Sequence, residues 1–244
     1  MDEGARVNLF GDALEFILTH LSGQTGVLQR IADHLLYSGL SILVALLIAL
    51  PVGLAVGHTG RGRNVVVAVS SATRALPSLG LLYFIVLLMG LGLEPVVIVL
   101  VFLAIPPILA GAYAGLESVS RQTIDAARGI GLSEWQILWQ VEVPLALPLI
   151  VGGIRSGVLQ VIATATIAAY FGLAGLGRFL AEGLAAQDYS IALAGAILVA
   201  ALAAVVDGVL ALVQILVTPR GVSRGVTGPK NPVLRVPRRA QLAQ

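Results

Sequence analysis

Long apolar runs with almost no charge are the feature that most constrains this chain. Leu36 to Gly57 is one such run without a single charged side chain, and similar runs recur along the sequence. About twenty apolar residues in a helix cross the roughly 30 Å of hydrocarbon in a bilayer. Only 11% of all residues are charged, less than half the share in a typical soluble domain. The expected fold class is therefore an all-α, polytopic membrane helical bundle, because runs of this length form helices rather than barrel strands.

Five of these runs predict five membrane spans. A sixth span is possible near the N-terminus, but the apolar run Leu14 to Leu21 is too short to cross a bilayer and charged residues bracket it. Residues 1–34 are therefore interpreted as an amphipathic or interfacial lead-in. The predicted spans are about 36–57, 65–90, 95–116, 149–171 and 190–217, with a polar segment at 117–148 and a basic tail at 218–244.

Two of the predicted spans carry breaks. The second span holds Arg74 and Pro77 near its middle, and proline removes a backbone donor and disfavours helix at the residue before it. The third span holds Pro106 and Pro107 near its centre. The Gly-rich stretch Gly172 to Asp188 is expected to be a loop with a short helix.

The distribution of basic residues predicts the orientation. Arg61 and Arg63 follow the first span, Arg121 and Arg128 follow the third, and six of the fifteen basic residues lie in the tail, which has no acidic residue. By the positive-inside rule the 58–64 loop, the 117–148 segment and the C-terminus lie in the cytoplasm, and the N-terminus lies outside. The basic residues of 218–244 are interpreted as part of a C-terminal tail and not as a nucleic-acid-binding patch.

The polar segment Ser120 to Pro148 predicts two short helices joined at Gly131. Arg121 to Ile130 forms the first helix, and glycine suits the left-handed residue that ends it. Ser133, with Gln136 three residues later, predicts a capping box for the second helix, which carries Trp135 and Trp139 on one face. Pro144 and Pro148 are expected to close the segment and turn the chain back to the bilayer.

This segment resembles the cytoplasmic EAA loop, E-A-A-x3-G-x9-I-x-L-P, of permease subunits of ATP-binding-cassette importers. Asp125-Ala126-Ala127 stands for the E-A-A, Gly131 for the glycine, and Val141-Glu142-Val143-Pro144 for the closing I-x-L-P. Asp replaces Glu and Val replaces Ile and Leu, which keeps the charge and the apolar character. The resemblance implies a type I importer fold and a coupling helix that docks on a separate ATPase subunit, where ATP and magnesium bind. It also implies a second permease subunit, an extracytoplasmic solute-binding protein and a bacterial or archaeal inner membrane. The residues expected to couple to the ATPase are Asp125, Ala126, Ala127, Gly131, Ser133, Val141, Val143 and Pro144.

Three further stretches resemble osmoprotectant permeases, which import glycine betaine, choline, carnitine or related quaternary ammonium compounds. They are Ala75 to Leu82, Val141 to Arg155 and Ile167 to Gly177. Permeases for amino acids or sulfonates in the same importer class remain an alternative. An autonomous secondary transporter is a further alternative. That class needs an internal repeat or paired broken helices, together with intramembrane acids for ion coupling, but no repeat is visible and only Asp207 is available.

Polar and aromatic residues at membrane depth are the candidates for a translocation path: Arg74, Pro77, Ser78, Tyr83 and Tyr170. An intramembrane arginine is costly and by default functional, although Arg74 could instead snorkel to the cytoplasmic surface. Arg155 and Asp207 lie at comparable depths from that surface and are expected to pair as a structural brace. Glycines at four-residue spacing, such as Gly111 with Gly115 and Gly153 with Gly157, predict close helix packing.

Catalytic and nucleotide-binding motifs are absent from the sequence. It contains no G-x-x-x-x-G-K-[ST] motif, its single lysine is Lys230, and it has no cysteine. The three histidines, His20, His34 and His58, are scattered. We therefore expect a translocation subunit and not an enzyme, with no cofactor or metal bound by this chain.

Overall fold

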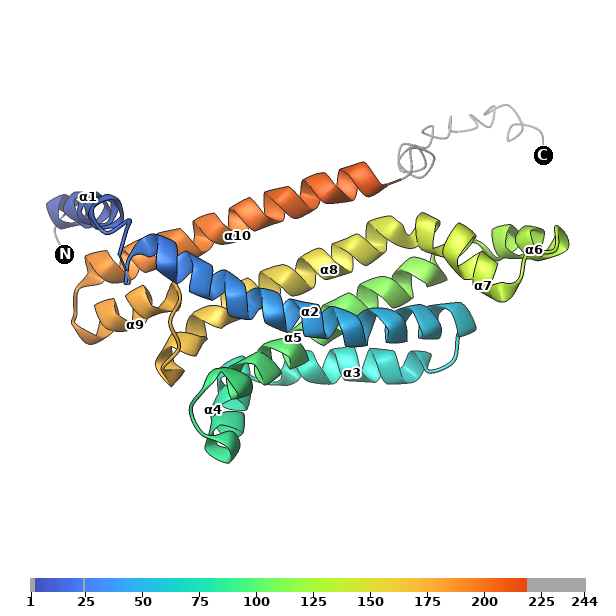
Figure 1. Cartoon of the computed structure of the whole chain (residues 1–244), viewed down its shortest axis with the longest axis horizontal. Helices are drawn as coiled ribbons and strands as arrows, with labels where there is room; N and C mark the ends of the chain where they lie inside the picture. Colours follow the sequence, from blue (N-terminus) through green and yellow to red (C-terminus); the bar gives the residue numbers. More distant parts are fainter. Residues whose placement is uncertain (1–2, 24, 219–244) are drawn as a thin grey trace, which may run out of the picture.

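The computed structural model describes residues 3–23 and 25–218, and the regular elements within them are helical. Figure 1 shows α2, α5, α8 and α10 running along the length of the molecule, with α6 and α7 at one end and α1 and α9 at the other. The elements are α1 (Glu3–Thr19), α2 (Val27–Thr59), α3 (Arg63–Ala75), α4 (Ser78–Met89), α5 (Leu93–Glu117), α6 (Arg121–Gly129), α7 (Glu134–Ile137), the π-helical turn η1 (Leu138–Glu142), α8 (Val143–Ala165), the 3-10 helix η2 (Thr166–Phe171), α9 (Gly177–Ala185) and α10 (Tyr189–Val217).

The described residues contain four helices long and apolar enough to cross a membrane, and a bent pair that can serve as a fifth. The four are α2, α5, the continuous helical stretch Glu134–Phe171 and α10. The bent pair is α3 with α4, whose axes differ by 91°. The predicted all-helical polytopic bundle is confirmed, and α1, with 17 residues, is not one of these candidate spans.

The helix α5 forms the centre of the bundle, with α2 packed on one side and α8 on the other. Glycines make both contacts close. A Cβ added to Gly53 would lie 2.6 Å from the Cβ of Ala112, and one added to Gly111 would lie 2.5 Å from the Cα of Gly153. Small residues allow this approach, and dispersion contacts of this kind hold helices together in lipid. The predicted packing role of these glycines is confirmed.

The break in the second span lies where the sequence predicts it. The helix α3 ends at Ala75, Leu76 is extended with φ −80° and ψ 129°, and α4 begins at Ser78. Pro77 explains the extended residue, because its ring excludes the helical conformation from the residue before it. Figure 1 shows α4 turned away from the direction of α3.

Pro144 and Pro148 do not turn the chain back, which corrects the prediction. Both lie inside α8, and the helix runs on from α7 through η1. In the π-helical turn the Val143 N–H donates to the carbonyl of Leu138, five residues back. Helices absorb a missing proline donor by bending at such a turn rather than by ending. The second helix of the polar segment is therefore continuous with the fourth span.

The helix that contains the first predicted span begins before that span, because α2 starts at Val27. The polar residues that suggested a later start have partners at the α9 end of the molecule. Arg30 lies 5.0 Å from the ring centroid of Phe179 and 3.7 Å from a carboxylate oxygen of Glu182. His34 is fully buried and its Nε2 lies 3.1 Å from the carbonyl of Ile162. These contacts lower the cost of burying a charge and an imidazole beside an apolar helix.

Candidate functional site

The polar segment begins with a capped helix that ends at a glycine. The Ser120 hydroxyl accepts a hydrogen bond from the backbone N–H of Thr123 at 3.2 Å, which caps α6. At the other end Leu132 N–H donates to Ala127 O and Gly131 N–H donates to Arg128 O. With Gly131 at φ +91° these two bonds form a Schellman motif. The predicted left-handed role of Gly131 is confirmed.

A capping box starts the second helix of the segment, as the sequence predicts. The Ser133 N–H donates to the side-chain carbonyl of Gln136 at 2.9 Å, and the Gln136 N–H donates back to the Ser133 hydroxyl at 3.4 Å. Only Leu132 separates Gly131 from this box, so the hairpin between α6 and α7 is defined by hydrogen bonds on both sides.

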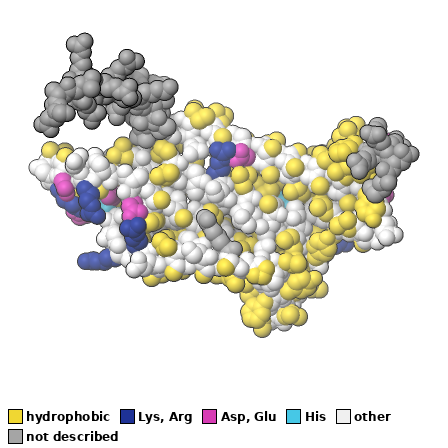
Figure 2. Space-filling view, turned by 180° about the vertical axis from the view of Figure 1, so that it is seen from behind, with side chains coloured by type: hydrophobic (Ala, Val, Ile, Leu, Met, Phe, Trp, Pro, Cys, Tyr) yellow, Lys and Arg dark blue, Asp and Glu magenta, His cyan; other side chains and the backbone are white. Residues whose placement is uncertain are grey.

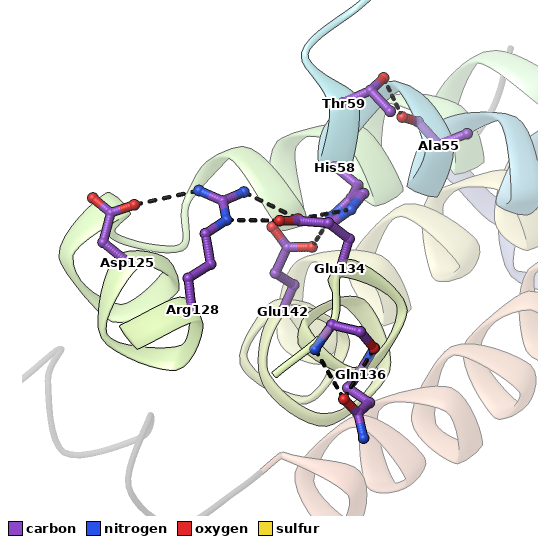
Figure 3. A network of polar contacts seen from close by, with 9 residues as sticks. Ala55, His58, Thr59, Asp125, Arg128, Glu134, Gln136 and Glu142 are labelled. Atoms are coloured by element: carbon purple, nitrogen blue, oxygen red, sulfur yellow. Dashed lines mark hydrogen bonds and ion pairs between the residues drawn. The ribbon is translucent and has the colours of Figure 1, made fainter. Parts of the chain in front are cut away.

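A network of charged side chains holds α6 against α7 (Figure 3). Arg128 donates to both carboxylate oxygens of Glu134, at 2.8 Å and 3.0 Å, and to Asp125 at 3.3 Å. Donating these hydrogen bonds to the Glu134 carboxylate raises the pKa of Arg128 above its ordinary value. Asp125 and Glu134 are solvent-exposed, so each surface pair contributes modestly, and the bidentate geometry adds direction.

The same network reaches the end of α2 through His58 (Figure 3). The His58 Nδ1 contacts the Glu142 carboxylate, and its Nε2 lies 3.6 Å from Glu134. Glu142 is only 3% exposed, and a buried carboxylate is costly unless it is paired. Side-chain contacts therefore join the α6–α7 hairpin and η1 to the end of α2.

Sequence reasoning missed this link. It treated His58 as an isolated histidine and Glu142 as the variable position of the I-x-L-P motif. The one available signal was an acidic residue in the apolar, proline-flanked run VEVPLALP, where a lone charge needs a partner.

The residues predicted to couple to the ATPase divide into an exposed set and a packed set. Asp125 and Ala126 are exposed on α6, whereas Ala127 is buried. Val141, Val143 and Pro144 are partly buried where η1 meets α8. Figure 2 shows the face of the molecule opposite to that in Figure 1. Most of the charged side chains on this face gather toward the α6–α7 end, while hydrophobic side chains cover much of the rest.

An apolar patch is exposed at the α6–α7 end. Ile130 is 80% exposed and Trp135 is 69% exposed, and the rings of Trp135 and Trp139 meet edge to face with centroids 5.6 Å apart. Exposed aromatic groups rimmed by charges are typical of protein interfaces. This end therefore has the character of a docking surface.

A cavity of about 380 Å³ lies beside the break between α3 and α4. Its lining combines three hydroxyls and one amide with apolar side chains: Thr73, Leu76, Ser78, Leu103, Pro106, Pro107, Ser156 and Gln160. Four helices, α3, α4, α5 and α8, therefore contribute to a single polar space within the spanning part of the bundle.

Only some of the predicted path residues belong to this cavity. Ser78 lines it, whereas the described lining does not include Tyr83 or Tyr170, which are both more than half exposed. Tyr83 packs edge to face on Phe171. Pro77 occupies the position before α4 without capping it, and Arg74 lies in α3 with its side chain outside the described part of the structure. Sequence reasoning missed Thr73, Ser156 and Gln160, although Ser156 and Gln160 are polar residues one helical turn apart in an apolar span.

Arg155 and Asp207 lie together, as the sequence suggested. The guanidinium contacts both carboxylate oxygens and bridges α8 to α10, with each side chain about one-third exposed. A second polar contact joins the same helices, because the Gln214 amide donates to the carbonyl of Pro148 at 2.8 Å. The ion pair thus neutralises two charges that would each be expensive in hydrocarbon.

The variant Asp207→Asn tests whether this pair braces the bundle. We expect the melting temperature of the detergent-purified chain to fall by about 4 °C or more, because Arg155 keeps its charge and loses its counter-ion. The double variant Arg155→Gln with Asp207→Asn is the matched control and should recover part of the loss. An unchanged melting temperature in the single variant would show that the pair contributes nothing to stability.

Comparison with known proteins places this geometry in a family. Residues 41–217 match the family of binding-protein-dependent transport system inner membrane components. The glycine betaine/carnitine/choline transport system permease protein OpuCB of Bacillus subtilis is 33% identical over 206 residues, which cover 84% of this chain and 95% of that protein. The carnitine transport permease protein OpuCB of Listeria monocytogenes is 34% identical over 196 residues, with coverages of 80% and 90%. The osmoprotectant import permease protein OsmW of Salmonella typhimurium is 32% identical over 195 residues, with coverages of 78% and 91%.

The fold itself has a solved counterpart. The chain superposes on a chain from an inward-facing structure of the MetNI methionine transporter with a TM-score of 0.69 and 21% identity, covering 79% of this chain and 96% of the other. The chain belongs to the family of binding-protein-dependent transport system inner membrane components. It is a multi-pass permease subunit of an ATP-binding-cassette transporter in a bacterial inner membrane, and the ATPase is a separate subunit.

Proposed function

We propose that this chain is the permease subunit of an ATP-driven importer for a small osmoprotectant, such as glycine betaine, choline or carnitine. The observation that carries the proposal is the similarity to permeases of that substrate class, at 32–34% identity over about four-fifths of the chain. The cavity at the α3–α4 break supports it, since small polar solutes need hydrogen-bonding groups inside the bundle.

In this proposal the ATPase subunit docks on the α6–α7 end. The exposed patch of Ile130, Trp135 and Trp139 is its contact surface, and the charged network holds the hairpin in shape. Because α7 continues into α8, a shift of the hairpin moves one wall of the cavity directly. His58 and Glu142 transmit the same shift to α2. ATP hydrolysis can drive transport only if the ATPase binds this end with different contacts in its two conformational states.

The remaining partners follow from the same proposal. The α6–α7 end of the molecule and the basic C-terminal tail face the cytoplasm. Residues 219–244 of this tail lie outside the described residues. A second permease subunit, identical or homologous, completes the path, and an extracytoplasmic binding protein delivers solute at the α9 end. ATP and magnesium bind on the ATPase subunit. The helix α1 lies at the extracytoplasmic surface of the inner membrane.

Solute uptake by the complete importer tests the function. Proteoliposomes holding the permease, its ATPase and its binding protein should accumulate radiolabelled glycine betaine or carnitine with ATP inside and not with ADP. Uptake should exceed that of methionine by at least tenfold. Accumulation of methionine in preference to all three osmoprotectants would overturn the substrate assignment and favour an amino-acid importer.

A further inference from the structure

The cavity at the α3–α4 break has the size and lining of a solute site. Its volume of about 380 Å³ falls within the roughly 300–1,000 Å³ of small-molecule sites in proteins. Hydroxyl and amide groups of Thr73, Ser78, Ser156 and Gln160 share its wall with leucines and prolines. Polar groups inside an apolar bundle are expensive, so a polar-lined space within the membrane points to a polar occupant.

The α8 side of the cavity presents hydrogen-bond acceptors. The Gln160 amide N–H donates to the Thr164 hydroxyl at 3.3 Å, so among the described residues its carbonyl oxygen is the group left to accept. Ser156 lies one turn away on the same face of α8. Across the space, the Thr73 hydroxyl donates to the carbonyl of Val69 at 2.7 Å, which leaves its oxygen lone pairs as acceptors.

The α5 side adds backbone acceptors. Pro106 and Pro107 have no N–H, so the carbonyls of Phe102 and Leu103, four residues earlier, lose their regular helical donors. Leu103, Pro106 and Pro107 line the cavity, so the stretch of α5 that lacks these two proline donors forms part of its wall. Carbonyl and hydroxyl oxygens carry partial negative charge and suit a cationic group.

The α4 side has the opposite polarity. The helix begins at Ser78, which lines the cavity, and Pro77 before it provides no side-chain cap. The first backbone N–H groups of α4 therefore have no helical acceptor and carry partial positive charge. The oxygen-lined cavity defines the site, and this helix end sets the direction in which a dipolar ligand would lie.

We propose that the cavity is a solute-contact site selective for a small zwitterion, with its cationic group toward α5 and α8 and its carboxylate toward the start of α4. The inference rests on the proposed function and deepens it, because it separates zwitterions such as glycine betaine and carnitine from the simple cation choline. Gln160 contacts the cationic group, which glycine betaine and choline share. The start of α4 separates the two solutes, because choline has no carboxylate to place there.

Two variants of Gln160 test the site in the complete importer in proteoliposomes. Maximal uptake rates of glycine betaine and choline are compared with saturating, solute-loaded binding protein, so that delivery is not limiting. The wild type should favour glycine betaine, and Gln160→Leu should lower the glycine betaine rate by about fivefold, because the trimethylammonium group loses a carbonyl dipole that faces it. Gln160→Glu keeps the shape and adds a negative charge, and it should shift the rate ratio toward choline by about tenfold.

Thr166→Val is the matched control, because Thr166 follows α8 in η2, lies outside the described lining and donates only to the nearby carbonyl of Ala163. It should leave the rate ratio unchanged. Basal ATP hydrolysis and the elution profile of each complex report correct folding. Equal loss of both solutes in Gln160→Glu, or an unchanged ratio in both variants, would overturn the site. A wild-type importer that takes up none of glycine betaine, choline and carnitine would instead overturn the proposed function.

Discussion

Replacing Gly111 by alanine should strongly reduce the amount of folded permease in the membrane. The added Cβ would lie 2.5 Å from the Cα of Gly153 and 2.9 Å from the carbonyl oxygen of Leu149. Both atoms are backbone, so no side-chain rotation relieves the clash and α5 must separate from α8. We expect a destabilisation at or above the ~3 kcal/mol upper range for overpacked cores. Membrane abundance and thermal melting in detergent measure it.

Gly208→Ala provides the matched control for this experiment. Gly208 also lies within a long helix, α10, but a Cβ there would meet no atom within 4 Å. The same substitution should be neutral or slightly stabilising, because alanine favours helix by about 1 kcal/mol over glycine. A Gly111→Ala protein that melts like the wild type would contradict the close packing of α5 on α8.

The second large effect is expected at Gly131. Proline there requires φ near −65° where the chain has φ +91°, and it removes the N–H that donates to Arg128 O at 2.9 Å. The Schellman motif would be lost, and the α6–α7 hairpin would no longer present a single surface. We expect Gly131→Pro to reduce co-purification of the ATPase subunit and solute-stimulated ATP hydrolysis by at least tenfold.

Gly131→Asn separates this backbone requirement from a general intolerance to change. Asparagine adopts the left-handed conformation at modest cost, and a Cβ at Gly131 would meet no neighbouring atom. Association and coupling should therefore be largely retained in Gly131→Asn. Coupling that survives Gly131→Pro intact would show that the hairpin is not the site of ATPase docking.

Local chemistry explains which features could be predicted. The break before Ser78 follows from Pro77 alone, and the capping box of Ser133 with Gln136 follows from two residues at the right spacing. The closing prolines show the limit of such reasoning. Pro144 was expected to end a segment, but the π-helical turn before it keeps the helix continuous, and hydrogen-bond register within a helix is not visible in composition.

Contacts between distant residues account for what could not be predicted. His58 and Glu142 are 84 positions apart, and neither residue has a local pattern that indicates the other. The early start of α2 depends on Glu182 and Phe179, which lie in α9 and lower the cost of burying Arg30. The pair of Arg155 and Asp207 could be anticipated because each is a charge at membrane depth that demands a counter-ion.

The sequence by itself determined the helical membrane class, the break at Pro77 and the glycine-ended, serine-capped hairpin, because backbone bonding, proline geometry and hydropathy act within a few residues. The tertiary structure alone decided that α7 and α8 form one continuous helical stretch and that Glu142 contacts His58. It also decided that Thr73, Ser78, Ser156 and Gln160 line one cavity. Those outcomes depend on which polar groups become buried together, and burial is set by the packing of α2 and α8 against α5.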